Sequence, residues 1–146
     1  MKQTKNIVFI AVAVIGVAIF ASVGRTNATD TAYLYDGEPE IIAATFSSAW
    51  CSSCKILEPR LRDVAPEFAD SPVKFVKLDF TFGQRGEIED QARAEGLEDI
   101  YPQYKGATGF TLLVDADTGE IVDSLTINHS PKAMRAAIAR ALAAAQ

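Results

Sequence analysis

The chain has 146 residues, 49% of them hydrophobic and 23% charged, which is the balance of a globular protein and excludes a disordered one. It carries 14 basic and 19 acidic residues, a net charge of −5. Because Lys2, Lys5 and Arg25 precede Thr29, the chain from Thr29 onward has 11 basic and 19 acidic residues, a net charge of −8. Such an acidic domain lacks the basic face that binding to nucleic acid or to an anionic membrane surface requires.

The N-terminal segment predicts that the rest of the chain is exported. An apolar run from Ile7 to Gly24 comes after Lys2 and Lys5 and ends at Arg25. A basic start, an apolar middle and a small-residue site describe a cleaved signal peptide, whereas about 17–25 apolar residues describe a membrane anchor. The run lies at the lower edge of that second range, so both interpretations stay open. A buried core helix fits worse, because the run has no amphipathic face.

Both interpretations divide the chain in the same way. Residues 1–28 are a signal peptide or a signal anchor, with a transmembrane helix over about residues 7–24 in the second case, and residues 29–146 form one domain. The N-terminal lysines stay in the cytoplasm. We therefore expect a domain that faces the periplasm from an inner-membrane anchor, or that is periplasmic after cleavage.

The first half of the domain alternates strand and helix patterns. The apolar run 40–46 predicts a buried strand. Apolar residues at helical spacing predict a helix over 51–69, which Pro59 should kink. A Ser-Pro break comes next, and the alternation within 73–79 predicts a second strand, before a polar helix over 86–96.

The second half of the domain ends in a hairpin and a helix. An irregular stretch over 97–109 precedes a predicted strand over 110–115. A hairpin turn signal at 117–119 then leads to a return strand over 120–127. Ser130 and Pro131 are typical of a helix start, as cap and first residue, and predict a last helix to about Ala145.

This order of elements predicts an α/β fold. Strand–helix–strand units imply parallel pairing with a right-handed crossover, and the late hairpin adds an antiparallel edge. We expect a mixed four-stranded sheet flanked by helices on both faces, preceded by the N-terminal apolar helix.

The only two cysteines, Cys51 and Cys54, lie where the first strand is predicted to turn into a helix. Unpaired N–H groups and the positive end of the helix dipole stabilise a thiolate at Cys51. Cys54 lies one turn further in, close enough to form a disulfide with it. Cys51 can then attack a partner's disulfide, and Cys54 can resolve the mixed disulfide. The intervening Ser52 and Ser53 can donate hydrogen bonds to the thiolate.

Other uses of a cysteine pair stay open. A static disulfide across so short a loop constrains little of the unfolded chain. Zinc needs about four ligands, and the only histidine, His129, lies far along the chain in a predicted loop. A copper(I) site or metallochaperone suits a thiolate pair. A peroxiredoxin-type peroxidase fits least, because Ser48 resembles that pattern but Ala44 stands where its proline is expected.

The segment around the cysteines resembles the active-site segment of the thioredoxin family. The strand-ending Phe46, Trp50 before the first cysteine, Lys55 after the second and the downstream Pro59 match that pattern in type and position. Lys77 matches the lysine of the family's next strand.

The likeness extends over about residues 38–145 and implies a thioredoxin-like fold and a CxxC thiol–disulfide oxidoreductase. It implies that the redox-active disulfide Cys51–Cys54 carries out the exchange, and that the protein uses no other cofactor and no metal. The implied substrates are protein thiols and disulfides in the periplasm or at the outer face of the inner membrane, with a membrane or periplasmic redox partner. The Ser-Ser pair between the cysteines leaves the direction of electron flow open.

Thr45 departs from the family pattern. The family often has a buried carboxylate six residues before the first cysteine, where it helps to move the proton of the resolving thiol, and Thr45 occupies that position. We therefore expect proton transfer at Cys54 to rely on water, on Lys77 or on Glu58.

The loop before the third strand departs as well. The family usually has a cis-proline there, whereas this chain has Phe110, preceded by Gly109. Because a cis bond before a non-proline residue costs about 2.5–4 kcal/mol, we expect a trans bond, with Phe110 either packed in the core or forming a wall beside Cys51. Residues 98–106 are extra relative to the simplest members and predict a surface loop, with a lid or partner surface as the alternative.

Overall fold

The computed structural model describes residue 35, residues 37–82 and residues 85–146. The predicted signal peptide or anchor, residues 1–28, lies outside these described residues. Among the described residues, no helix is both long enough and apolar enough to cross a membrane.

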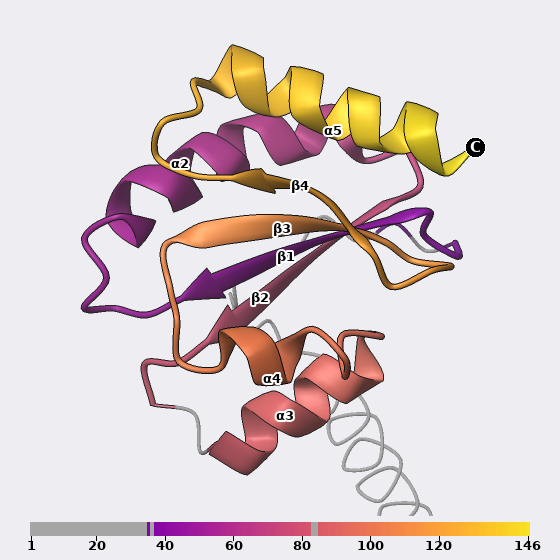
Figure 1. Cartoon of the computed structure of the whole chain (residues 1–146). Helices are drawn as coiled ribbons and strands as arrows, with labels where there is room; N and C mark the ends of the chain where they lie inside the picture. Colours follow the sequence, from indigo (N-terminus) through magenta and orange to yellow (C-terminus); the bar gives the residue numbers. More distant parts are fainter. Residues whose placement is uncertain (1–34, 36, 83–84) are drawn as a thin grey trace, which may run out of the picture. The chain divides into compact units, whose positions relative to one another are not determined.

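The predicted mixed sheet is present, with its first strand at the centre. The strands are β1 (Ile41–Ser47), β2 (Val73–Asp79), β3 (Phe110–Asp115) and β4 (Ile121–Leu125), and they lie in the order β2-β1-β3-β4. β1 pairs with β2 in parallel and with β3 in antiparallel, and β3 pairs with β4 in antiparallel (Figure 1). Every residue of β1 is buried, as a strand covered on both faces and both edges must be.

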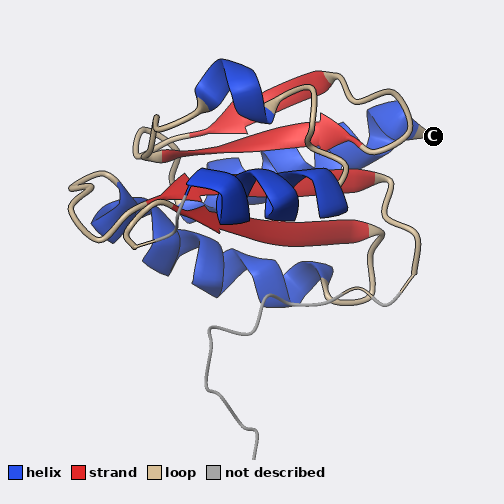
Figure 2. Cartoon of the chain, turned by 90° about the horizontal axis from the view of Figure 1, so that it is seen from below, coloured by secondary structure: helices blue, strands red, loops and turns tan. Residues whose placement is uncertain are grey.

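Helices cover both faces of the sheet. α2 (Cys54–Val64) and α5 (Pro131–Ala145) lie on one face, while α3 (Arg85–Ala94) and the short α4 (Tyr101–Tyr104) lie on the other (Figure 1 and Figure 2). α5 begins as the sequence predicts, because the Ser130 hydroxyl accepts a hydrogen bond from the Ala133 N–H at 3.2 Å.

The two-residue period of β1 divides its side chains between two hydrophobic cores. Ile41 and Ala43 pack with α2 and α5, whereas Ile42, Ala44 and Phe46 pack with α3 and α4. The same alternation directs the last polar residues of the strand, at positions 45 and 47, toward α2. The carboxyl end of β1 therefore presents hydroxyl groups to the helix that carries the second cysteine.

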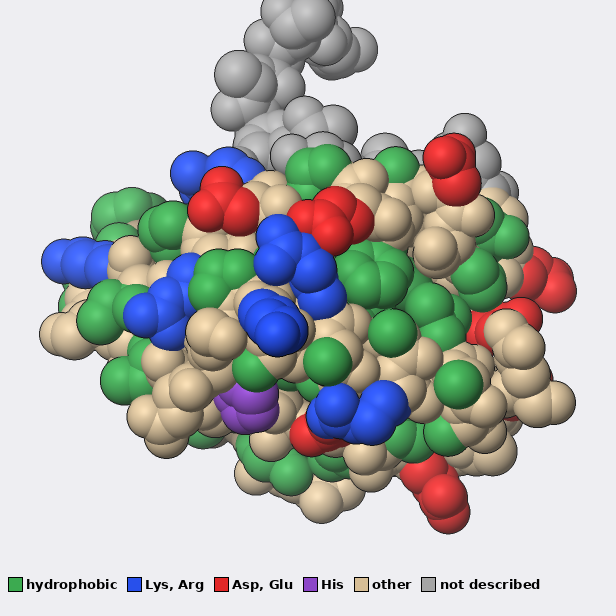
Figure 3. Space-filling model, turned by 90° about the horizontal axis from the view of Figure 1, so that it is seen from above, with side chains coloured by type: hydrophobic (Ala, Val, Ile, Leu, Met, Phe, Trp, Pro, Cys, Tyr) green, Lys and Arg blue, Asp and Glu red, His purple; other side chains and the backbone are tan. Residues whose placement is uncertain are grey.

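Polar contacts join α5 and its preceding loop to α2 and the turn after it. Arg60 of α2 donates hydrogen bonds to the backbone carbonyls of Ile127 at 2.6 Å and His129 at 2.9 Å. Arg135 pairs with Glu67 at 2.7 Å. On this face, basic and acidic side chains lie among one another (Figure 3). His129 lies in the loop before α5, as predicted, and its Nδ1 accepts a hydrogen bond from the Thr126 N–H at 3.1 Å.

Two sequence predictions about the helices were wrong. The helix expected over 51–69 is shorter, since α2 begins at Cys54 and ends at Val64, and a 3₁₀ helix, η1 (Ala65–Phe68), comes after it. Pro66 explains the change at the C-terminal end, because it supplies no N–H and its ring disfavours a continued α-helix.

The second error concerns residues 97–109, which were expected to be irregular, with 98–106 a surface loop. They contain α4, and Ile100 and Tyr101 are buried, at 3% and 1% exposure. The Tyr101 ring stacks on Phe80 with 6.3 Å between centroids. Burial of these two apolar side chains holds the segment against the sheet, although its local sequence has little helical character.

Leu57 and Ile56, neighbours on α2, give a matched test of the core. Leu57 is fully buried, whereas Ile56 is 45% exposed. We expect Leu57→Ala to lower the free energy of unfolding by about 2–5 kcal/mol, because it leaves a cavity between α2 and the sheet. Ile56→Ala should cost about 1 kcal/mol or less. Urea denaturation of both variants measures the difference, and equal losses would contradict the described packing of α2.

Candidate functional site

Cys51 and Cys54 form a disulfide at the junction of β1 and α2, with 5.3 Å between their Cα atoms. Cys51 lies in the turn after β1 and is partly exposed, whereas Cys54 is the first residue of α2 and is 2% exposed. Cys51 is therefore the more accessible of the two cysteines.

The start of α2 provides a polar environment for the Cys51 sulfur. The Cys54 N–H donates a hydrogen bond to Cys51 Sγ at 3.1 Å, and the first turn of α2 contains no acidic residue. Both features stabilise negative charge on Cys51 once the disulfide is reduced. Ser53 precedes α2, but its hydroxyl makes no capping hydrogen bond.

The surroundings of Cys54 are formed by the end of β1. Cys54 Sγ lies 3.9 Å from the carbonyl oxygen of Phe46. Thr45, at the position where related proteins often have a carboxylate, is 8% exposed, and its hydroxyl shares a hydrogen bond of 2.8 Å with the hydroxyl of Thr111 on β3. Thr45 is thus satisfied within the sheet.

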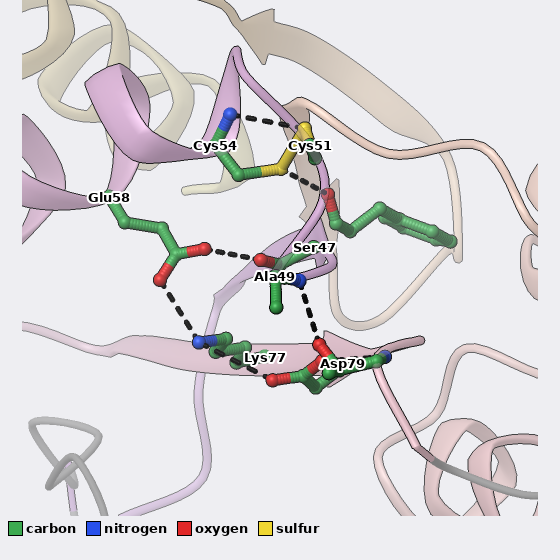
Figure 4. The surroundings of a disulfide bond; sticks show 9 residues. Ser47, Ala49, Cys51, Cys54, Glu58, Lys77 and Asp79 are labelled. Carbon is green, nitrogen blue, oxygen red and sulfur yellow. Dashed lines mark hydrogen bonds and ion pairs between the residues drawn. A yellow bond between two sulfur atoms is a disulfide. The ribbon is translucent and has the colours of Figure 1, made fainter.

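A chain of polar side chains runs from β1 through α2 to β2 (Figure 4). The Ser47 hydroxyl donates a hydrogen bond to Glu58 Oε1, and Lys77 Nζ lies 2.9 Å from Glu58 Oε2 and 3.6 Å from Asp79 Oδ2. Strand register explains the arrangement, because Thr45 pairs with Lys77 and Ser47 with Asp79, so all four point to the α2 face.

An open cavity of about 380 Å³ lies beside the disulfide. Its lining includes Ser47, Glu58, Lys77 and Asp79, together with Cys54, Lys55 and Pro59. Asp79 at its edge is ionised at neutral pH. Burial raises the pKa of Asp79, but hydrogen bonds from Thr81 and the charge of Lys77 outweigh that effect and hold it below its ordinary value of 3.8.

An exposed aromatic pair lies next to Cys51. Trp50 is 67% exposed, and its ring meets that of Phe82, which is 88% exposed, edge to face with 5.7 Å between centroids. Trp50 was expected at the site from the sequence, whereas Phe82 was missed. The signal that could have found it is its place just after the second strand, whose carboxyl end lies at the same edge of the sheet as that of the first.

The backbone before β3 contacts the disulfide closely. Gly109 has a φ of +101°, and its N–H donates to the Phe46 carbonyl at 2.8 Å. A Cβ atom on Gly109 would lie 2.9 Å from Ser53 Cβ and 3.3 Å from Cys51 Sγ. Peptide bonds in the described part of the chain are all trans. Phe110 points away from this contact and stacks on Phe46 with 5.1 Å between centroids.

The cysteine pair is the site's candidate for binding a soft metal ion. Within the described ranges, no three His, Cys, Asp or Glu side chains come together in a way that could hold a metal. The arrangement suits disulfide exchange, with one partly exposed cysteine, one buried cysteine and a polar cavity beside them.

Comparisons with known proteins agree with this geometry. The family model described as Thioredoxin matches residues 26–107, more than half of the chain. The chain is 33% identical to a protein disulfide-isomerase of Aspergillus oryzae over 76 residues, 52% of this chain and 14% of that protein. It is 29% identical to Thioredoxin H2-2 of Oryza sativa subsp. japonica over 82 residues, 56% of this chain and 58% of that protein. The chain thus spans less than two thirds of these relatives.

Solved structures share the fold. A protein described as DsbH Oxidoreductase superposes with a TM-score of 0.52 and 20% identity, over 72% of this chain and 74% of that one. A thiol:disulfide interchange protein from Chlorobium tepidum TLS gives a TM-score of 0.50 and 18% identity, over 72% and 81%. Fold and site together define a domain of the thioredoxin-like class with a CxxC disulfide at the end of its central strand. The chain belongs to the thioredoxin family.

Gly109 and Gly106 allow the contact with the disulfide to be tested. Both have positive φ, but a Cβ on Gly106 would meet nothing within 4 Å. We expect Gly106→Ala to cost about 1 kcal/mol of unfolding free energy from backbone strain alone. Gly109→Ala should cost more, about 2–3 kcal/mol, and should slow alkylation of reduced Cys51. Urea denaturation and alkylation rates measure the two effects, and identical behaviour of the variants would contradict a close contact at Gly109.

Proposed function

We propose that this protein exchanges disulfides with other proteins, with Cys51 as the nucleophile and Cys54 as the resolving thiol. The observation that carries the proposal is the asymmetry of the pair. Cys51 is partly exposed and lies in the turn just before α2, while Cys54 is 2% exposed. Different access and different charge stabilisation give the two sulfurs different roles.

The chemistry consists of two displacements. The Cys51 thiolate attacks one sulfur of a partner disulfide, so that a Cys51–partner bond forms and the partner's other sulfur leaves as a thiolate. The Cys54 thiolate then attacks Cys51, which forms the internal disulfide and releases the partner's second thiolate. The partner gains two electrons and this protein loses them. The reverse sequence oxidises a partner dithiol.

The aromatic pair beside Cys51 favours a protein as partner. Trp50 and Phe82 together expose large apolar side chains next to the reactive sulfur, and aromatic residues of this kind often anchor protein interfaces. Gly109 adds no side chain beside Cys51, where a Cβ atom would lie 3.3 Å from the sulfur.

The place of action that we propose is outside the cytoplasm. Support comes from the N-terminal sequence, in which Lys2 and Lys5 precede the apolar run from Ile7 to Gly24. As a signal peptide or an anchor, residues 1–28 would deliver the domain to the periplasm or the outer face of the inner membrane, where a redox partner recycles it. A reduction potential near −270 mV would identify a reductant, and one near −120 mV an oxidant.

Alkylation of the reduced protein tests the two roles. At pH 7 we expect iodoacetamide to modify Cys51 about tenfold or more faster than Cys54, because only Cys51 is both accessible and stabilised as a thiolate. Cys51→Ser should abolish reduction of insulin disulfides, and Cys54→Ser should accumulate the mixed disulfide. Equal, slow labelling would count against the proposal, and stoichiometric copper(I) retention without exchange activity would identify a metallochaperone.

Trp50→Ala tests the protein-binding surface. We expect it to raise the KM for a protein disulfide about tenfold, which corresponds to about 1.4 kcal/mol, with little change for a small disulfide such as oxidised glutathione. Ile121→Ala is the control, because Ile121 is 39% exposed but lies on the far strand β4. A similar rise in KM for both substrates, or for both variants, would remove Trp50 from the proposed interface.

A further inference from the structure

The resolving cysteine shares a helix face with a carboxylate. Cys54 and Glu58 are four residues apart on α2, so their side chains lie one above the other, with about 6 Å between Cβ atoms. Both line the cavity beside the disulfide, and Ser47 lines it with them. Figure 4 shows the Glu58 carboxylate pointing toward Ser47, to which it is hydrogen-bonded.

Cys54 needs a proton acceptor during resolution, because only its thiolate attacks Cys51. At 2% exposure, Cys54 has little contact with bulk water. The strand position that could supply a carboxylate holds Thr45, whose hydroxyl is paired with that of Thr111. An acceptor must therefore come through the cavity, and the carboxylate nearest in sequence that lines it is Glu58.

We propose that Glu58 accepts the proton of the Cys54 thiol, passed through the Ser47 hydroxyl. The proposal rests on the proposed function of the cysteine pair. A hydroxyl can accept one hydrogen bond while it donates another, and Ser47 already donates to Glu58. This route requires the Cys54 S–H of the reduced protein to donate to Ser47 Oγ, and both residues line the same cavity.

Proton transfer and displacement together conserve atoms and charge. The Cys54 proton moves to Ser47 Oγ as the Ser47 proton moves to Glu58 Oε1, so Ser47 ends neutral and Glu58 becomes a carboxylic acid. The Cys54 thiolate then displaces the partner thiolate from Cys51, forming the Cys51–Cys54 bond. The released thiolate carries away the electron pair, and Glu58 returns its proton to that thiolate or to water. In the opposite direction, Glu58 protonates Cys54 as it leaves.

Lys77 positions the carboxylate and does not replace it. An ammonium group has no lone pair with which to accept a proton, and Lys77 Nζ holds Glu58 Oε2 at 2.9 Å, which leaves Oε1 for Ser47. The other charged groups that line the cavity are Asp79 of β2, and Lys55 and Arg62 of α2.

The reaction of the reduced protein with 5,5′-dithiobis(2-nitrobenzoate) separates the two displacements, because each releases one coloured thiolate. We expect Glu58→Gln to slow the second release about 100-fold at pH 6–7. The rate of the first release should stay within about twofold of that of the unmodified protein. The defect should shrink as the pH rises toward 9, where hydroxide takes the proton. Glu58→Asp, which keeps the carboxylate, should restore part of the rate at neutral pH.

The matched control is Glu67→Gln, which removes a carboxylate that is paired with Arg135 after the end of α2. Its two releases should match those of the unmodified protein at every pH. A second release in Glu58→Gln that keeps the unmodified pH profile would overturn the proposal, and so would an equal slowing of both releases. If the unmodified protein gave no second release at all, the proposed roles of Cys51 and Cys54 would fail instead.

Discussion

β1 is paired on both edges and covered on both faces, and the position of the candidate site depends on this strand. Its seven residues are all buried, so its end is held in place by the sheet and by both hydrophobic cores. The turn after it carries Cys51, and α2 begins three residues later. A cysteine that follows a rigid strand end and precedes a helix N-terminus needs no ligand or movement to be oriented.

The parallel pairing of β1 with β2 explains the polar cavity. Parallel strands end at the same edge of a sheet, so the register brings Ser47 beside Asp79 and Thr45 beside Lys77. Glu58 reaches this edge from the helix layer above. The exposed aromatic residue Phe82, just past β2, arrives beside Trp50 for the same reason. One strand pairing thus assembles both the surface near Cys51 and the interior near Cys54.

Much of this could be predicted from the sequence because local patterns determine it. The strand alternation, the Ser130 cap and the cysteine spacing each depend on neighbouring residues, and the sheet and CxxC site result from them. Residues 98–106 could not be predicted, because α4 is held by burial of Tyr101 against Phe80, a contact between distant segments. For proton transfer the sequence left water, Lys77 and Glu58 open. The hydrogen bond between Ser47 and Glu58, which the sequence does not reveal, is what favours Glu58.

The location of Glu58 on α2 has a mechanical consequence. If the carboxylate were on a strand, its distance from a thiol on a helix would change whenever the helix shifted on the sheet. Cys54 and Glu58 instead belong to one rigid body, and helix geometry alone sets their spacing. Thermal sliding of α2, or a substitution that shifts it, displaces both groups together. The thiol and the carboxylate keep their mutual geometry through such motions, and only the Ser47 contact has to re-form.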